Sequence, residues 1–93
     1  MNPTPTHILV VEDEPIVALD LQQRLEKMGY RVPSVVATGE AAIAAAVSER
    51  PQLVLMDISL AGPMDGVEAA EQITNQLRVP VVFLTAFSND QTL

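Results

Sequence analysis

The stretch ILVVED, residues 8–13, decides the fold of this 93-residue chain. Four apolar residues run together and are followed directly by two acids. A second stretch, LVLMD at residues 53–57, repeats this pattern and ends on Asp57. Short runs that are apolar throughout are typical of strands buried on both faces of a parallel sheet. We therefore expect both stretches to be strands of an α/β domain.

Helical patterns separate the apolar runs along the rest of the chain. The expected strands are 7–11, a short strand centred on 34–36 within 30–37, 52–57 and 81–85, and the expected helices are 15–28, 38–49 and one that carries Val67, Ala70, Ile73 and Leu77 on its buried face. The first helix carries Val17, Leu21, Leu25 and Met28 at helical spacing. Pro15 suits its first position and Gly29 its end. This alternation predicts a doubly wound parallel sheet with right-handed crossovers, preceded by a flexible tail at residues 1–6.

The composition excludes several classes of function. The net charge is −7 and the pI is near 4.3, and the five Lys and Arg residues never cluster along the chain. We therefore expect neither nucleic acid nor an anionic membrane surface as a partner. Without cysteine, a disulfide, a zinc–thiolate site or a thiol nucleophile is excluded. The apolar segments are too short to span a membrane, and the amino terminus lacks a secretory pattern, so we expect a cytoplasmic protein.

Three acids follow the two central strands. Glu12 and Asp13 follow the first, and Asp57 ends the other. Ligands of such sheets bind beyond the carboxyl ends of the strands, so neighbouring strands would bring these carboxylates together. Like charges this close persist only with a cation, a proton or deep hydration. The pattern therefore predicts a metal site, with Asp57 as a possible nucleophile.

At these residues the chain resembles the receiver domains of two-component response regulators. The matching pieces, in order, are ILVVEDE at 8–14, LVLMD at 53–57, PMDG at 63–66 and PVVFLTA at 80–86. The resemblance implies a flavodoxin-like α/β fold in which the four strands of this chain have the order 2-1-3-4. It also implies that residues 7–93 are a truncated receiver domain, because the family's pattern continues with a fifth strand and a fifth helix.

The resemblance further implies what the site does. Asp57 would accept a phosphoryl group from a sensor histidine kinase or a phosphotransfer protein, with Mg²⁺ (or Mn²⁺) as the cofactor. Asp13 and Asp57 would bind the metal directly, Glu12 through a water molecule, and the backbone carbonyl of Ser59 would be a further ligand. The hydroxyl of Thr85 and the backbone N–H of Ala86 would contact the phosphoryl group. His7, the only histidine, begins a strand next to the tail and is not expected to carry phosphate, so the donor is another protein.

The resemblance also implies what this chain lacks. The catalytic lysine belongs to the family's fifth strand, and Lys27, the only lysine here, is expected at the wrong end of the sheet. We therefore expect impaired phosphorylation at a site that binds metal better than it signals. An uncovered strand edge or apolar face would also favour a homo-oligomer.

Two other functions remain open. One is a dimerisation or interaction fragment that acts without phosphorylation. The other is a metal-dependent phosphohydrolase with an aspartyl-phosphate intermediate. Such enzymes typically carry a second Asp two positions after the first, and that position is Ser59 here. In the preferred interpretation the chain is not an enzyme, beyond catalysing its own phosphorylation and dephosphorylation. Gly66 is expected to supply a positive φ in the loop beside the site.

Overall fold

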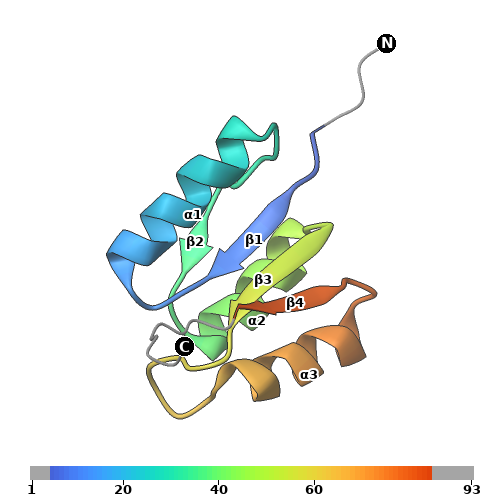
Figure 1. Ribbon diagram of the computed structural model, residues 1–93. Helices are drawn as coiled ribbons and strands as arrows, with labels where there is room; N and C mark the ends of the chain where they lie inside the picture. Colours follow the sequence, from blue (N-terminus) through green and yellow to red (C-terminus); the bar gives the residue numbers. More distant parts are fainter. Residues whose placement is uncertain (1–4, 85–93) are drawn as a thin grey trace.

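The structure, a computed structural model, describes residues 5–84 and shows a parallel sheet with helices on both faces (Figure 1). In chain order, the elements are β1 (Ile8–Val11), α1 (Pro15–Lys27), β2 (Val35–Val36), α2 (Gly39–Glu49), β3 (Leu53–Asp57), α3 (Gly66–Gln76) and β4 (Val81–Leu84). The strands have the order β2-β1-β3-β4, and every pair of neighbours is parallel. None of the helices within residues 5–84 is long and apolar enough to cross a membrane. The predicted fold and strand order are confirmed.

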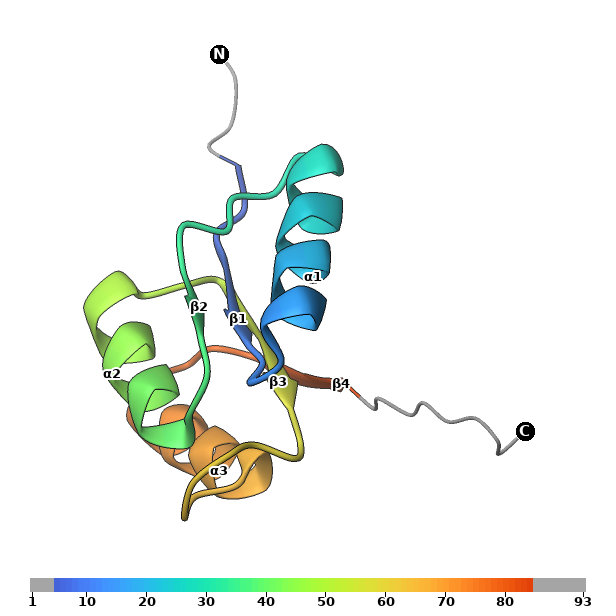
Figure 2. The same cartoon turned by 90° about the vertical axis from the view of Figure 1, so that its left-hand side faces the viewer.

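The sheet has a core on each face, because successive residues of a strand point to opposite faces. Figure 2 shows α1 on one side of the sheet and α2 and α3 on the other. The larger core lies on the α2–α3 side, and its buried residues are Leu9, Val11, Ala42, Ala46, Val54, Met56, Ala69 and Ile73. The smaller core lies on the α1 side, with Ile8, Val10 and Val32 buried. The three alanines buried in the larger core allow α2 and α3 to lie close to the strands.

Local signals in the sequence begin and end the helices. Pro15 is the first residue of α1, and Gly29 follows that helix with a φ of +99°, both as predicted. Thr38 caps α2, because its side-chain oxygen accepts a hydrogen bond from the N–H of Ala41 at 3.1 Å. Asp65 and Glu68 form a reciprocal capping box at the start of α3, with hydrogen bonds of 2.9 and 3.0 Å. This last cap was not predicted.

The buried face of α1 differs from the predicted stripe. Leu21 and Leu25 pack against the smaller core as expected. Val17 and Met28 are 39% and 67% exposed, and Ala18 is the buried residue of the first turns. The inner face therefore begins one residue later than predicted and ends before Met28. On α3, Val67 is likewise 44% exposed, whereas Ala70 and Ile73 are buried as predicted.

The two edge strands are short. β2 has only two residues, consistent with the Pro33 that precedes it. β4 pairs with β3 on one side and is the edge strand of the described sheet. Its residues Val82 and Phe83 are 48% and 39% exposed. The expectation of a homo-oligomer through this edge or the neighbouring apolar face stays a prediction.

The larger core predicts the effect of shortening Ile73, which is 1% exposed. We expect Ile73→Ala to lower the free energy of unfolding by about 2–5 kcal/mol, because the cavity left in the core cannot fully collapse. Urea denaturation measures this change. Val67→Ala on the same helix is the control and should cost less than about 1 kcal/mol, because much of that side chain is already in water. Equal losses in the two variants would contradict the assignment of the core.

Candidate functional site

The parallel pairing of β1 with β3 brings the three predicted acids together. The register runs from Ile8 opposite Leu53 to Val11 opposite Met56, so the next residues, Glu12 and Asp57, follow at the same end of the sheet. Glu12, Asp13 and Asp57 each offer a carboxylate oxygen, and these oxygens all lie within 4.8 Å of one another. The convergence predicted from the sequence is present.

Local hydrogen bonds orient two of these carboxylates. The backbone N–H of Glu14 donates to Oε2 of Glu12 at 3.1 Å. The backbone N–H of Ser59 donates to Oδ1 of Asp57, also at 3.1 Å. Bonds from a side chain to the N–H two residues on are typical of tight turns. Each turn that leaves a strand therefore fixes one oxygen of its own acid.

Burial makes the cluster electrostatically unfavourable without a cation. Glu12 is 5% exposed and Asp57 is 7% exposed, while Asp13 is partly buried. The pKa of Glu12 is raised from 4.5 to about 7. Burial is the main cause, and the nearby charges of Asp57 and Asp13 contribute to the rise, whereas the hydrogen bond from Glu14 opposes it. The three acids therefore need a proton or a metal ion to stay together.

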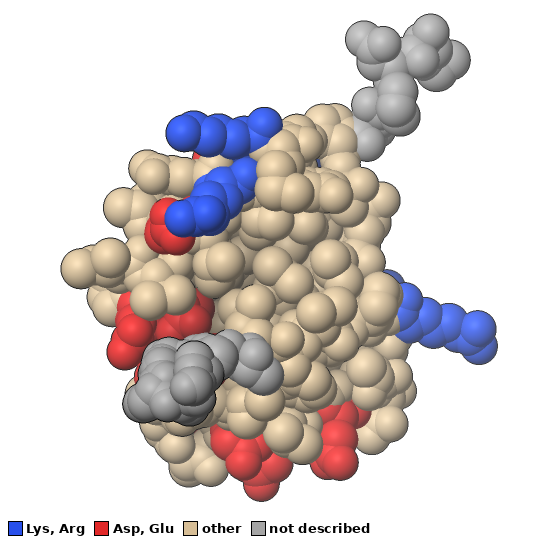
Figure 3. All heavy atoms as spheres, viewed as in Figure 1, with Lys and Arg blue, Asp and Glu red and all other residues tan. Residues whose placement is uncertain are grey.

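The charges of the chain are separated between the two ends of the sheet. All five Lys and Arg residues lie at the end away from the acidic cluster, because each is in the last turn of a helix or in the segment between a helix and the next strand: Arg24, Lys27, Arg31, Arg50 and Arg78. Figure 3 shows the blue side chains along the top and right of the molecule and most red ones at the left and bottom. These five cations are scattered along the sequence, but the fold gathers them at one end of the sheet. Within residues 5–84, no Lys or Arg neutralises the acidic cluster.

The donor set of the cluster fits a hard divalent cation. Mg²⁺ and Mn²⁺ prefer carboxylate and water oxygens, and Mg²⁺ is commonly held by one or two carboxylates. Glu12, Asp13 and Asp57 offer only carboxylate oxygens, and two of them are buried. These residues therefore suit the predicted metal.

The other predicted site residues have different outcomes. Ser59 lies beside Asp57, but the role of its carbonyl as a ligand stays a prediction. Thr85 and Ala86 lie outside the described residues. Leu84, the residue before Thr85 in the sequence, is paired in register with Asp57. Lys27 is in the last turn of α1, at the opposite end from the acids, as predicted.

Gly66 is needed for space and not for a positive φ, which corrects the prediction. It is the first residue of α3, and the positive φ in this part of the chain occurs at Gly62. A methyl group added to Gly66 would overlap the carbonyl oxygen of Asp57 and lie 2.9 Å from Cα of Ile58. The N–H of Gly66 also donates to the carbonyl of Ile58 at 2.9 Å. The start of α3 therefore lies directly against the backbone of the predicted acceptor.

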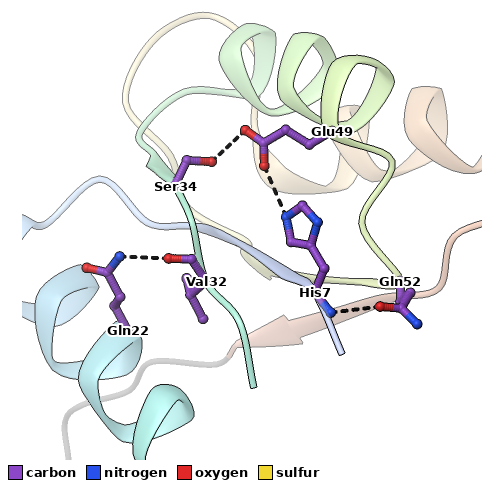
Figure 4. Close-up of polar contacts among 6 residues, drawn as sticks. All are labelled: His7, Gln22, Val32, Ser34, Glu49 and Gln52. Atoms are coloured by element: carbon purple, nitrogen blue, oxygen red, sulfur yellow. Dashed lines mark hydrogen bonds and ion pairs between the residues drawn. The ribbon is translucent and has the colours of Figure 1, made fainter. Parts of the chain in front are cut away.

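His7 lies at the far end of the sheet in a polar network (Figure 4). Its ring Nε2 is 3.2 Å from Oε1 of Glu49, and the hydroxyl of Ser34 donates to Oε2 of the same carboxylate at 2.7 Å. The backbone N–H of His7 donates to the side-chain oxygen of Gln52 at 2.8 Å. Gln22, which sequence analysis did not single out, joins α1 to the carbonyl of Val32 at 2.9 Å. These contacts join the elements of the fold and place His7 away from the acids.

Known proteins share this architecture. The family described as "Response regulator receiver domain" matches residues 8–93. The phyllosphere-induced regulator PhyR of Methylorubrum extorquens is 42% identical over 83 residues, which are 88% of this chain and 31% of that protein. The crystal structure of the response regulator PhyR from Brucella abortus gives a TM-score of 0.83 at 37% identity, covering 90% of this chain and 35% of that one.

A third similar protein was solved with its partner. The co-crystal structure of the anti-anti-sigma factor PhyR with the anti-sigma factor NepR, from Bartonella quintana, gives a TM-score of 0.82 at 35% identity. The match covers 96% of this chain and 37% of that one. The chain thus spans about a third of the length of these three proteins.

The raised pKa of Glu12 predicts how stability depends on pH. The folded protein keeps the proton of Glu12 up to about pH 7, whereas the unfolded chain loses it near 4.5. The stabilisation from this group is therefore complete below pH 4.5 and is lost as the pH rises through 7. We expect urea denaturation of the metal-free protein to show this fall between pH 4.5 and 8.

Substitution and metal provide the controls for this pH dependence. Glu12→Gln should remove the fall, whereas Glu14→Gln, at an exposed neighbour, should retain it. Saturating Mg²⁺ should cancel the fall, because the metal binds the deprotonated carboxylate. A metal-free profile that Glu12→Gln leaves unchanged would contradict the assignment.

Proposed function

Because the chain belongs to the response regulator receiver domain family, we propose that it is a phosphoacceptor module of a two-component phosphorelay. Asp57 receives the phosphoryl group from the phosphohistidine of a sensor histidine kinase or a phosphotransfer protein. The observation that carries this proposal is the buried cluster of Glu12, Asp13 and Asp57 at the carboxyl end of the central strands.

Asp57 is the nucleophile in this proposal. An oxygen of its carboxylate attacks phosphorus, the phosphorus–nitrogen bond of the donor breaks, and the donor imidazole takes up a proton from solvent. Phosphoryl transfer depends mainly on positioning and on charge neutralisation, so a carboxylate held by a fixed turn is sufficient. The hydrogen bond from Ser59 to Oδ1 orients the carboxylate and leaves Oδ2 for the attack. A bound Mg²⁺ or Mn²⁺ supplies the positive charge that neutralises the carboxylates and the phosphoryl oxygens.

The remaining roles belong to the same proposal. Glu12 and Asp13 hold the metal with Asp57, and the carbonyl of Ser59 is a further ligand. In this proposal, the hydroxyl of Thr85 and the backbone N–H of Ala86 bond the transferred phosphoryl group. These new contacts switch the surface of the domain between two states. No Lys or Arg of residues 5–84 lies at this end of the sheet, so we expect slow phosphorylation when the chain acts alone.

The proposal makes the chain a signalling module and not a classical enzyme. Its output is the binding of another protein. PhyR from Bartonella quintana, which is similar to this chain, was crystallised with the anti-sigma factor NepR, and this supports an output of that kind. The acidic charge and a kinase donor suit a cytoplasmic location.

Phosphorylation tests the proposal directly. Incubation with acetyl phosphate and Mg²⁺ should add the mass of one phosphoryl group to part of the protein, detected by intact mass spectrometry. Asp57→Asn should abolish the added mass, because an amide is not a nucleophile toward phosphorus. Asp65→Asn is the control, since Asp65 is exposed and belongs to a helix cap. Persistence of the added mass in Asp57→Asn would contradict the proposal.

The separation of charge predicts which donors react faster. We expect a phosphohistidine peptide whose histidine is flanked by lysines to phosphorylate Asp57 faster than one flanked by glutamates. The reason is that the end of the sheet with the acidic cluster, here called the site end, is negative. The ratio of the two rates should fall toward one as salt is added, since exposed charges are screened over about 10 Å at 0.1 M salt. Autoradiography of the reaction over time measures both rates.

A neutralised variant is the control for this effect. Glu14→Gln combined with Glu40→Gln removes two exposed charges from the site end, and Glu26→Gln removes one from the last turns of α1 at the other end. The first variant should reduce the ratio, and the second should leave it near that of the unaltered protein. A ratio that does not depend on salt would argue against electrostatic selection of the donor.

A further inference from the structure

The loop of residues 58–65, here named the acceptor loop, joins Asp57 to α3 and is closed at its base. The carbonyl of Ile58 accepts a hydrogen bond from the N–H of Gly66 at 2.9 Å, so the two ends of the loop lie together. Near its start, the N–H of Ser59 donates to Asp57. The rest of the loop needs another contact to fix it, because closure at the base does not hold its far side.

Met64 supplies that contact through Gly39, the first residue of α2. A methyl group added to Gly39 would lie 2.9 Å from Cγ and Sδ of Met64 and 3.1 Å from its Cβ. Gly39 is buried and has no positive φ, so this position requires glycine because it has no room for a side chain, and not because of its backbone conformation. Met64 is partly buried and packs against the larger core, as Leu60 does from the same loop. The side chain of Met64 therefore occupies a site that the missing side chain of Gly39 leaves free.

The position of α2 at this contact is itself fixed. Thr38 caps the helix immediately before Gly39, and Ala42, one turn later, is fully buried in the larger core. Because the helix cannot retreat without losing these contacts, a larger residue at position 39 has to displace Met64. Because Met64 packs against the larger core, we expect its displacement to move the acceptor loop, which also carries Ser59.

We propose that Gly39 and Met64 are positioning residues for the acceptor site, acting through the acceptor loop. The proposal rests on the proposed function of Asp57. Neither residue touches the carboxylate cluster, but together they fix the loop whose first turn orients Asp57. A crowded Gly39 misplaces the turn at Ser59 and weakens the metal site, while the sheet itself stays intact.

A double-substitution cycle tests this coupling. Gly39→Ala should weaken Mg²⁺ binding, measured by isothermal titration calorimetry, by about 10-fold, the lower end of what residues behind metal ligands contribute. In the Met64→Ala background, Gly39→Ala should change the affinity less than about twofold, because the two atoms that approach most closely, Cγ and Sδ, are then absent. Ser48→Ala, at an exposed position near the end of α2, is the control and should leave the affinity unchanged.

A second readout separates positioning from general stability. In metal-free protein, Gly39→Ala should shift the backbone amide resonances of Asp57 and Ser59, and the free energy of unfolding should not follow the loss of Mg²⁺ affinity across the variants. Equal effects of Gly39→Ala with and without Met64, or unshifted amides, would overturn the inference. If the unaltered chain binds no Mg²⁺, the proposed metal site fails, and the amide shifts alone decide the role of Gly39 and Met64.

Discussion

Repulsion among three carboxylates at one end of a parallel sheet is the constraint on which the rest of the structure depends. The register of β1 with β3 brings Glu12 and Asp57 to the same edge, and burial removes the water that would otherwise hydrate them. A raised pKa at Glu12 is the cost of this arrangement. Such a cluster is retained only where a proton or a cation stabilises it. The cluster therefore suits a divalent metal beside Asp57, the proposed nucleophile.

The surroundings of the cluster keep positive charge away from it and bring other segments close to the loop beside it. Helix ends and strand starts carry every Lys and Arg, so positive charge gathers at the opposite end of the domain. Glycine is required at two places because a side chain would not fit there. Gly66 allows α3 to begin against the backbone of Asp57, and Gly39 leaves room for Met64. A cation or a cationic donor therefore meets a preformed negative site.

Most of the fold could be predicted from the sequence, because the decisive signals are local. Each of these signals depends on only a few adjacent residues: the apolar runs, the acids that follow them, and Pro15 and Gly29 at the two ends of α1. Contacts between distant segments could not be predicted in this way. The exposure of Val17 depends on how α1 rolls on the sheet, and the common end of the five cations appears only after folding. The positive φ expected at Gly66 was wrong, since only the approach of α3 to Asp57 shows that space is the requirement. The contact of Gly39 with Met64 left no signal in the sequence.

Paramagnetic broadening by Mn²⁺ tests the central claim most directly, namely that Glu12, Asp13 and Asp57 form one metal site. In a ¹⁵N-labelled sample at substoichiometric Mn²⁺, the amide resonances of residues 12–14 and 57–59 should broaden first, and excess Mg²⁺ should restore them. Amides at the far end of the sheet, such as those of Glu49 and Gln52, should stay sharp. Broadening centred on exposed acids such as Asp65 and Glu68, or spread evenly over the acidic surface, would contradict the account.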